Sequence, residues 1–232
     1  VPSSIIYETV NDTETWCQQT SPFTLPPGLD IVMGDVCGGS STTSMAKKVM
    51  KWLKDKKAEA TPIWNDISAT NTMIHLTVQQ LGLFAQSHPE AYKAATTALA
   101  DSNTSTWESS KLALQGNLVA KLWISLRDAF RKSRRSLKMM GERAGVGIEP
   151  DEQTALANAT EEIPGVLCSG VPGAGGVDAI FAITMKDGVR DAVERMWSGW
   201  SGADGSSTVC PLLLTSDNAG RRGVERDFDL KW

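Results

Sequence analysis

The stretch that decides the fold is Leu29-Asp-Ile-Val-Met-Gly-Asp35, which continues into Val36-Cys-Gly-Gly-Ser-Ser-Thr-Thr43. The first part is a short apolar run behind Pro26-Pro27-Gly28, and a run of this length bounded by turn residues predicts a buried strand. The second part, rich in glycine and hydroxyl groups, predicts a loop. A helix is expected next, with Thr43 or Ser44 as its N-cap and an apolar face made by Met45, Val49, Trp52 and Leu53.

Helices and strands alternate along the rest of the chain. Helices are expected over residues 62–87, 90–100, 110–143 and 189–197, and another begins at Asp151. Pro62 suits the first turn of the first of these helices. Strands are expected over residues 166–171, 178–184 and 209–214. Because helices dominate the middle of the chain and strands flank them, the sequence predicts an α+β fold.

Composition excludes several classes of protein. The 232 residues carry 23 basic and 27 acidic side chains, a net charge of −4, so neither nucleic acid nor an acidic membrane surface is expected as a partner. No apolar run approaches the roughly 18 residues of a membrane span. The four cysteines and two histidines lack the spacing of a metal site. No secretion signal is recognisable, so we expect a cytoplasmic protein.

The predicted helix over residues 110–143 departs from this average. It holds nine basic and two acidic residues, which gives it a charge of +7 and leaves −11 on the rest of the chain. Its apolar stripe is expected to consist of Leu118, Leu122, Leu126, Phe130, Leu137 and Met140. Two interpretations of the charge remain open. The basic face packs near the acidic remainder of the protein, or it binds a phosphorylated ligand.

The segment Pro172-Gly-Ala-Gly-Gly176 lies between two predicted strands. Two glycines would suffice for a tight hairpin, and the surplus favours a loop whose backbone amides approach an anion closely. The segment matches neither the dinucleotide-binding pattern nor a P-loop, so its ligand stays unnamed on these grounds.

The loop at Gly38-Gly-Ser-Ser-Thr-Thr-Ser44 is a second candidate. It joins a predicted strand to a helix N-terminus, where free amides, hydroxyls and the helix dipole favour a phosphate or carboxylate. A hydroxyl-rich cap without any ligand is an equally good interpretation. No pattern of a nucleophilic triad or of a metalloenzyme is present.

Three blocks of sequence, in this order, resemble the C-terminal half of the phosphomevalonate kinases of the fungal and plant type, members of the GHMP kinase superfamily. The first runs from Leu29 to Met45. The second combines Arg131-Lys132 with Ile148-Glu-Pro-Asp-Glu-Gln-Thr154, and the third is Pro172-Gly-Ala-Gly-Gly-Val-Asp-Ala-Ile180. A weaker match continues through Gly223-Val-Glu-Arg226.

This resemblance implies ATP-dependent phosphorylation of (R)-5-phosphomevalonate with Mg2+, on the mevalonate route to isoprenoids and sterols. It implies a small antiparallel, ferredoxin-like sheet backed by long helices. Residues implied to contact the phosphomevalonate are Gly39, Ser40, Ser41, Thr42, Ser44 and, more weakly, Arg131. Residues implied to lie against the nucleotide or its phosphates are Gly173, Ala174, Gly175, Gly176 and Asp178.

The superfamily's ATP loop, of the form Pro-x-x-x-Gly-Leu-x-Ser-Ser-Ala, is not found in these 232 residues. We therefore expect residues 1–27 to be a linker from a missing N-terminal kinase lobe, and residues 28–232 to form the C-terminal domain. Neither Asp35 nor Asp178 is taken as the catalytic base, and the chain alone is expected to be inactive. The alternatives are a non-catalytic ligand-binding or interaction module and, with less support, a diphosphomevalonate decarboxylase.

Overall fold

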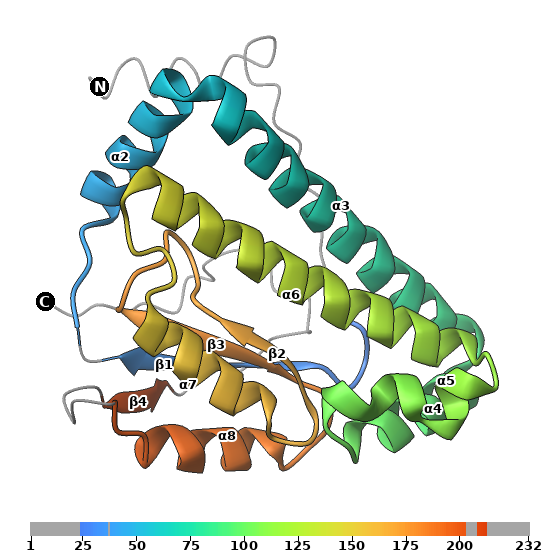
Figure 1. The fold of residues 1–232 in the computed structure, drawn as a ribbon. Coiled ribbons are helices and arrows are strands. Elements are labelled where there is room, and N and C mark those ends of the chain that lie inside the picture. The colour runs from blue at the N-terminus through green and yellow to red at the C-terminus, as the bar shows by residue number, and fades with distance from the viewer. Residues whose placement is uncertain (1–23, 37, 203–207, 213–232) are drawn as a thin grey trace, which may run out of the picture.

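The centre of the molecule is a four-stranded antiparallel sheet (Figure 1). A computed structural model describes residues 24–36, 38–202 and 208–212, and Figure 1 shows helices on both sides of the sheet. The strands stand in the order β2-β3-β1-β4. Their bounds are Asp30–Val36 for β1, Val166–Gly170 for β2, Ala179–Thr184 for β3 and Val209–Leu212 for β4.

The order of strands and helices is that of a split β-α-β-β-α-β unit, the ferredoxin-like arrangement. The helix α7 (Asp151–Glu161) leads into β2, and α8 (Val189–Ser198) connects β3 to β4. β1 pairs antiparallel with both β3 and β4, and β2 pairs antiparallel with β3. The predicted α+β fold with a ferredoxin-like sheet is therefore confirmed.

Alternating side chains give the sheet two buried faces. One face, which includes Val32, Ile180 and Ala182, packs against α7 and α8. The other face includes Ile183 and packs against the long helices. Across the first face the Trp197 indole of α8 donates a hydrogen bond to the Thr160 hydroxyl of α7, with a nitrogen-to-oxygen distance of 2.9 Å. The two ferredoxin-type helices are thus linked to each other as well as to the sheet.

A helical layer inserted between β1 and β2 covers the second face of the sheet. Its main members are α3 (Lys57–Ser87) and α6 (Leu118–Ala144), which run side by side in opposite directions (Figure 1). The remaining elements are α2 (Thr42–Asp55), α4 (Pro89–Ala100), the 3-10 helix η1 (Thr104–Ser109) and α5 (Lys111–Leu114). None of the helices in the described ranges has both the length and the apolar character that crossing a membrane requires.

Several predicted boundaries were wrong, and the caps explain why. The side chain of Ser41 caps α2, so the helix begins before the predicted Thr43 or Ser44. α3 begins at Lys57, which places Pro62 inside the helix. The predicted helix over residues 110–143 is two helices, because Asn117 caps a new start at Leu118. Residues 1–23, which make up most of the proposed linker, lie outside the described residues. So do residues 213–232, which include the block at 223–226 and the last two residues of the expected strand over 209–214.

The predicted stripe of α6 was partly wrong. Leu118 is exposed, whereas Leu126 is fully buried as predicted. Val119 and Trp123, which lie outside the predicted stripe, are fully buried as well. The Trp123 indole donates a hydrogen bond to the Thr96 hydroxyl of α4 at 3.0 Å. The buried face of α6 therefore keeps Leu126 and Met140 of the predicted stripe and adds Val119 and Trp123 to it.

We predict opposite effects for alanine at two glycines. In β1, a Cβ at Gly34 would lie 2.7 Å from Val209 Cγ1 and 2.9 Å from the Trp197 ring, so Gly34→Ala overpacks the core and should lower the unfolding free energy by about 1–3 kcal/mol. A Cβ at Gly82 in α3 meets nothing within 4 Å. Because alanine has the higher helix propensity, Gly82→Ala should raise the unfolding free energy by about 0.5–1 kcal/mol. Urea unfolding of both variants measures this. Equal effects of one sign would contradict the packing described at Gly34.

Candidate functional site

The register of β1 and β3 brings the two candidate loops to the same end of the sheet. Asp35 pairs with Ala179, so the end of β1 lies beside the start of β3. The Val36 amide extends this ladder by donating a hydrogen bond to the Asp178 carbonyl at 2.9 Å. The serine-rich loop that leaves β1 and the glycine-rich loop that enters β3 must therefore meet.

The two loops touch at Ser40. Its hydroxyl accepts a hydrogen bond from the Val177 amide at 3.0 Å. A Cβ at Gly176, whose φ is +106°, would overlap the Ser40 hydroxyl, and a Cβ at Gly38 would lie 2.7 Å from a methyl of Val177. Glycine at these positions lets the loops approach more closely than side chains permit.

A third segment, residues 146–150, lies against the glycine-rich loop. The Gly176 amide donates a hydrogen bond to the Ile148 carbonyl at 2.8 Å. A Cβ at Gly175, whose φ is +81°, would overlap the same carbonyl oxygen. The structure therefore brings together the blocks around Gly38, Ile148 and Gly175, which are the three blocks that carry the resemblance in the sequence.

The hydrogen bonds of the glycine-rich loop change the expectation that all its amides face an anion. Gly175 donates to the Pro172 carbonyl at 3.2 Å, so the amides of Gly175, Gly176 and Val177 are all bonded within the protein. The amides of Gly173 and Ala174 have no acceptor among the described residues. A Cβ at Gly173 would meet nothing within 4 Å. The open donors of this loop are therefore at its tip.

In the serine-rich loop one serine caps a helix, and most of the residues are exposed to solvent. The Ser41 hydroxyl accepts a hydrogen bond from the Ser44 amide at 3.4 Å and so acts as a helix cap. Gly39, Thr42 and Ser44 are exposed. The amides of the first turn of α2 have no acceptor within the helix, which leaves its positive end available to an anion.

Asp178 lies where the glycine-rich loop enters β3. Its carbonyl accepts the hydrogen bond from Val36, while its side-chain oxygen Oδ1 is buried and has no hydrogen-bond partner among the described residues. An acceptor without a donor is uncommon in a protein interior. A ligand or residue that donates a hydrogen bond at this point would satisfy it.

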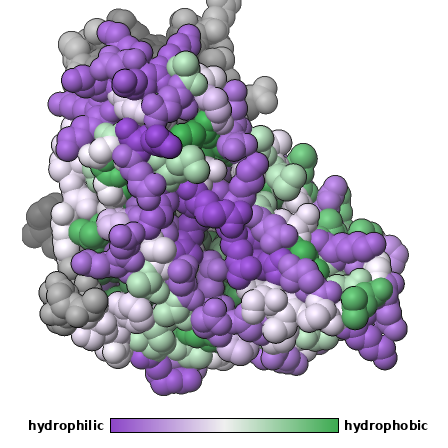
Figure 2. Space-filling view, in the orientation of Figure 1, coloured by the Kyte–Doolittle hydropathy of each residue, from purple (hydrophilic) through white to green (hydrophobic). Residues whose placement is uncertain are grey.

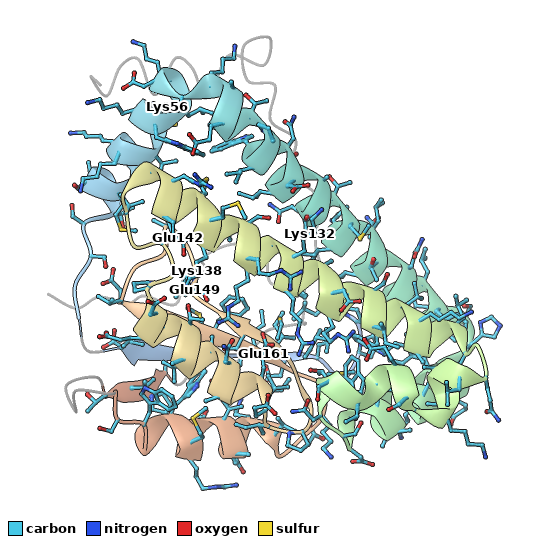
Figure 3. All side chains as sticks on the ribbon, viewed as in Figure 1. Lys56, Lys132, Lys138, Glu142, Glu149 and Glu161 are labelled. Atoms are coloured by element: carbon cyan, nitrogen blue, oxygen red, sulfur yellow. The ribbon has the colours of Figure 1, made fainter. Side chains whose placement is uncertain are left out.

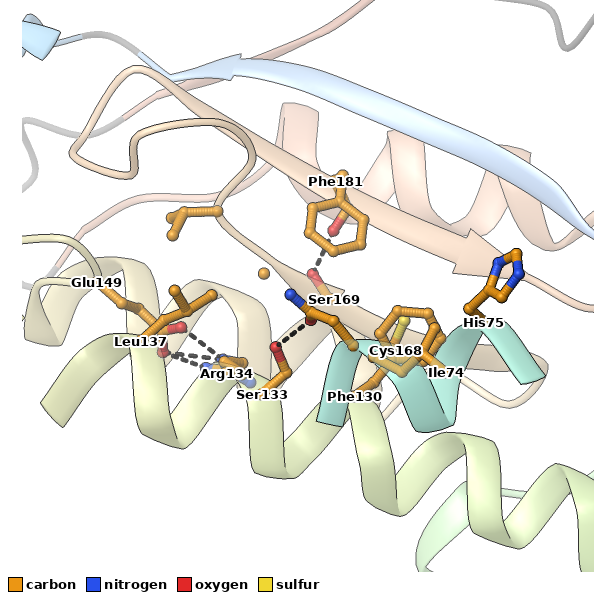
Figure 4. Close-up of a pocket in the computed structure, with 13 residues that line it drawn as sticks. Ile74, His75, Phe130, Ser133, Arg134, Leu137, Glu149, Cys168, Ser169 and Phe181 are labelled. Atoms are coloured by element: carbon orange, nitrogen blue, oxygen red, sulfur yellow. Dashed lines mark hydrogen bonds and ion pairs between the residues drawn. The ribbon is translucent and has the colours of Figure 1, made fainter. Parts of the chain in front are cut away.

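A pocket of about 330 Å³ opens beside the glycine-rich loop, between α3, α6 and the sheet (Figure 4). Its lining includes Gly170 and Val171, which lead into the loop, and the side chains of Asn71, Ser133, Phe130 and Phe181. Burial raises the pKa of the Cys168 thiol in this lining well above its usual range, with the Glu161 carboxylate adding to the effect. A buried thiol whose pKa is raised is a poor nucleophile.

The basic face of α6 is largely neutralised by acidic side chains. Six of its eight basic residues have an acidic partner, and Figure 3 shows Lys138, Glu149 and Glu161 gathered between α6 and α7. Hydrophilic residues dominate this face in the space-filling view (Figure 2). The hydrogen bond from Lys138 lowers the pKa of Asp151. Of the two interpretations left open, the structure supports a basic face packed near acids.

Arg131 belongs to this ion-pair system. Its guanidinium lies 3.2 Å from the Glu161 carboxylate and donates to the Thr104 hydroxyl at 3.0 Å. The structure does not bring it to either loop. What the sequence missed is the partner set of Arg134, which bonds Glu149 through Nε at 2.8 Å and lies 3.4 Å from Glu161. Only the +7 charge of the segment hinted at such partners.

The described residues contain no cluster of side chains that would hold a metal ion by itself. No group of three or more histidine, cysteine, aspartate or glutamate side chains within them is placed to hold a metal ion. We assign no Mg2+ ligand to this part of the chain. A nucleotide phosphate fits better, because the tip of the glycine-rich loop and the start of α2 both offer amides.

The fold and the loops together define an α+β domain in which two loops meet at one end of the sheet, with open backbone amides that are candidates for binding an anion. Its relatives are known. The chain is 32% identical over 206 residues to the peroxisomal phosphomevalonate kinase of Arabidopsis thaliana, a match that covers 88% of this chain and 39% of that protein. It is 28% identical over 172 residues to the phosphomevalonate kinase of Candida albicans, covering 74% and 34%. The chain is thus a relative of the plant and fungal phosphomevalonate kinases, which confirms the resemblance seen in the sequence.

The chain spans little more than a third of the length of these curated relatives. A crystal structure of the Lin0012 protein from Listeria innocua overlaps it with a TM-score of 0.49 and 14% identity, over 93% of this chain and 49% of that one. No family model matches the chain.

We predict that alanine is tolerated much better at Gly173 than at Gly175. Both glycines have a positive φ, +66° and +81°, so both variants bear a similar backbone cost. Only the Gly175→Ala methyl overlaps the Ile148 carbonyl, which should lower the unfolding free energy by about 1–3 kcal/mol more than Gly173→Ala. Chemical unfolding of the two variants tests this, and equal losses would contradict the contact.

Proposed function

We propose that the protein containing this chain transfers the γ-phosphoryl group of ATP to (R)-5-phosphomevalonate, with Mg2+, on the mevalonate route to isoprenoids and sterols. This chain would supply the C-terminal part that contacts substrate and phosphates. The observation that carries the proposal is the meeting of the Gly38, Ile148 and Gly175 blocks, which are far apart in the sequence. The names of the curated relatives support the same reaction.

The geometry suits the chemistry of phosphoryl transfer. A phosphate oxygen of phosphomevalonate attacks the γ-phosphorus, the bond to ADP breaks, and the protein mainly positions the groups and balances their charge. The amides of Gly173 and Ala174 and the start of α2 would face phosphate oxygens. The neighbouring pocket, lined by Phe130 and Phe181 as well as by polar groups, would take the branched carbon chain. No residue of this chain is assigned as the catalytic base.

We propose further that activity requires an N-terminal kinase lobe as partner. The ATP loop of the superfamily and the catalytic base would come from that lobe. The short span of the chain relative to its curated relatives supports this arrangement. A cytoplasmic location remains a prediction.

The proposal predicts activity only when both lobes are present. The chain should release no ADP from ATP and phosphomevalonate, whereas the chain joined behind the N-terminal part of the Arabidopsis relative should do so in a coupled assay. Mevalonate and diphosphomevalonate serve as control substrates and should not be phosphorylated. Turnover by the chain alone, comparable with a full-length relative, would contradict the requirement for a second lobe. A preference for mevalonate would contradict the substrate.

Binding tests the substrate contact without the second lobe. Phosphomevalonate should bind the chain weakly in calorimetry, and Gly175→Leu should abolish binding because its side chain displaces the loop from Ile148. Gly82→Ala, far from the loops on α3, is the matched control. Binding that survives Gly175→Leu removes the loop from the site. Binding without any turnover in the joined protein would favour the non-catalytic binding module instead.

A further inference from the structure

Glu149 is a buried charge in the segment that holds the glycine-rich loop. It is the one charged residue of Val146-Gly-Ile-Glu-Pro150, and its side chain is 2% exposed. A carboxylate in such a place is costly unless it is paired and hydrogen-bonded. Its position next to Ile148, whose carbonyl binds the loop, raises the question of what the charge does.

The Glu149 carboxylate has two partners among the described residues, Arg134 and Thr154. Arg134 Nε lies 2.8 Å from one carboxylate oxygen and 2.9 Å from the other. The Thr154 hydroxyl donates to the first oxygen at 3.0 Å. Arg134 in turn donates to the Thr154 carbonyl at 3.1 Å. The segment 146–150 is thus fixed to α6 and to the first turn of α7.

The same arginine connects this segment to the sheet. Arg134 Nη1 lies 3.4 Å from Glu161, and Glu161 accepts a hydrogen bond from the Ser169 amide of β2 at 3.3 Å. Figure 3 shows Glu149 and Glu161 in the space between α6 and α7. The Arg134 guanidinium is therefore linked to both ends of the glycine-rich loop. It reaches one end through Glu161 and β2, and the other through Glu149 and the neighbouring Ile148 carbonyl.

Packing on the other side of the segment is equally close. Ile148 belongs to an apolar cluster with Trp52 of α2 and Met140 of α6. A Cβ at Gly141 of α6 would lie 2.7 Å from the Val146 carbonyl and 3.0 Å from Ile148. The segment has little room to move as long as its charge is held in place.

We propose that Glu149, held by Arg134, is a positioning residue: it fixes the Ile148 carbonyl that receives the Gly176 amide and so sets the conformation of the glycine-rich loop. The expected effect of Glu149 on substrate binding rests on the proposed function. The positioning of the loop does not, because it is argued from the Arg134–Glu149 ion pair and from the hydrogen bond between the Gly176 amide and the Ile148 carbonyl. Neither Glu149 nor Arg134 is assigned a contact with the reacting groups.

Hydrogen–deuterium exchange of the 232-residue chain tests the structural part without ligand. Glu149→Gln should speed exchange of peptides covering residues 172–178 by roughly tenfold or more, while peptides of α8 stay unchanged. Arg134→Met should do the same, and Arg134→Lys should restore part of the protection because it keeps the charge. In the double variant Arg134→Met with Glu149→Gln, the loop should exchange no faster than in the worse single variant.

Two controls separate positioning from general loss of stability. Glu142→Gln removes an exposed carboxylate near the end of α6, the helix that carries Arg134, and should leave the exchange rate of the glycine-rich loop unchanged. Arg127→Gln removes a buried arginine of α6 that pairs with the exposed Glu108 carboxylate, and it should destabilise the fold without a selective effect on the loop. Equal acceleration in Arg127→Gln and Glu149→Gln, or no acceleration in Glu149→Gln, overturns the proposal.

Substrate binding then distinguishes this inference from the proposed function. If both hold, Glu149→Gln weakens phosphomevalonate binding by roughly tenfold, and Glu142→Gln leaves it unchanged. Faster loop exchange with unchanged phosphomevalonate affinity supports the positioning role and counts against the proposed substrate contact. Weakened binding with unchanged loop exchange overturns the positioning role and leaves the proposed function standing.

Discussion

The pairing of β1 with β3 is the constraint on which the candidate site depends. Because the two strands are antiparallel with Asp35 opposite Ala179, the exit of one and the entrance of the other share one end of the sheet. A shift of the register by one residue would turn Val32 and Ile180 away from α7 and α8, so the core itself holds the register in place. The position of two loops that are more than 130 residues apart thus follows from the burial of a few apolar side chains.

Sequence reasoning could reach the parts of this structure that depend on local patterns. The strand at Leu29–Asp35, the hairpin around the glycine-rich loop and the two ferredoxin-type helices all have clear apolar periodicity and turn residues at their ends. Helix starts were less predictable, because Ser41, Thr43 and Ser44 all carry a hydroxyl that can cap a helix, and the sequence does not show that Ser41 is the one that does. The break before Leu118 was missed for a similar reason, since Gly116 and Asn117 stand within an otherwise helical pattern.

The partners of the charged residues could not be predicted at all. Arg134 and Glu149 are 15 residues apart, and neither stands in a recognisable motif with the other. Their pairing results from α7 folding back along α6, which no local pattern encodes. The net charge of +7 showed only that acidic partners or an anionic ligand must exist. The structure shows acidic partners for six of the nine basic residues.

This neutralisation changes what can bind an anion here. A guanidinium already paired with a buried carboxylate offers little attraction to a phosphate, because the ligand would have to displace or share an existing partner. Backbone amides keep their dipoles whatever the neighbouring side chains do. The amides of Gly173 and Ala174, and those of Thr42 and Thr43 at the start of α2, have no acceptor among the described residues. The glycines therefore have two separate tasks. Gly175 and Gly176 permit the close contacts with Ile148 and Ser40 that fix the loop, and this fixed conformation leaves the amides at the tip open to an anion.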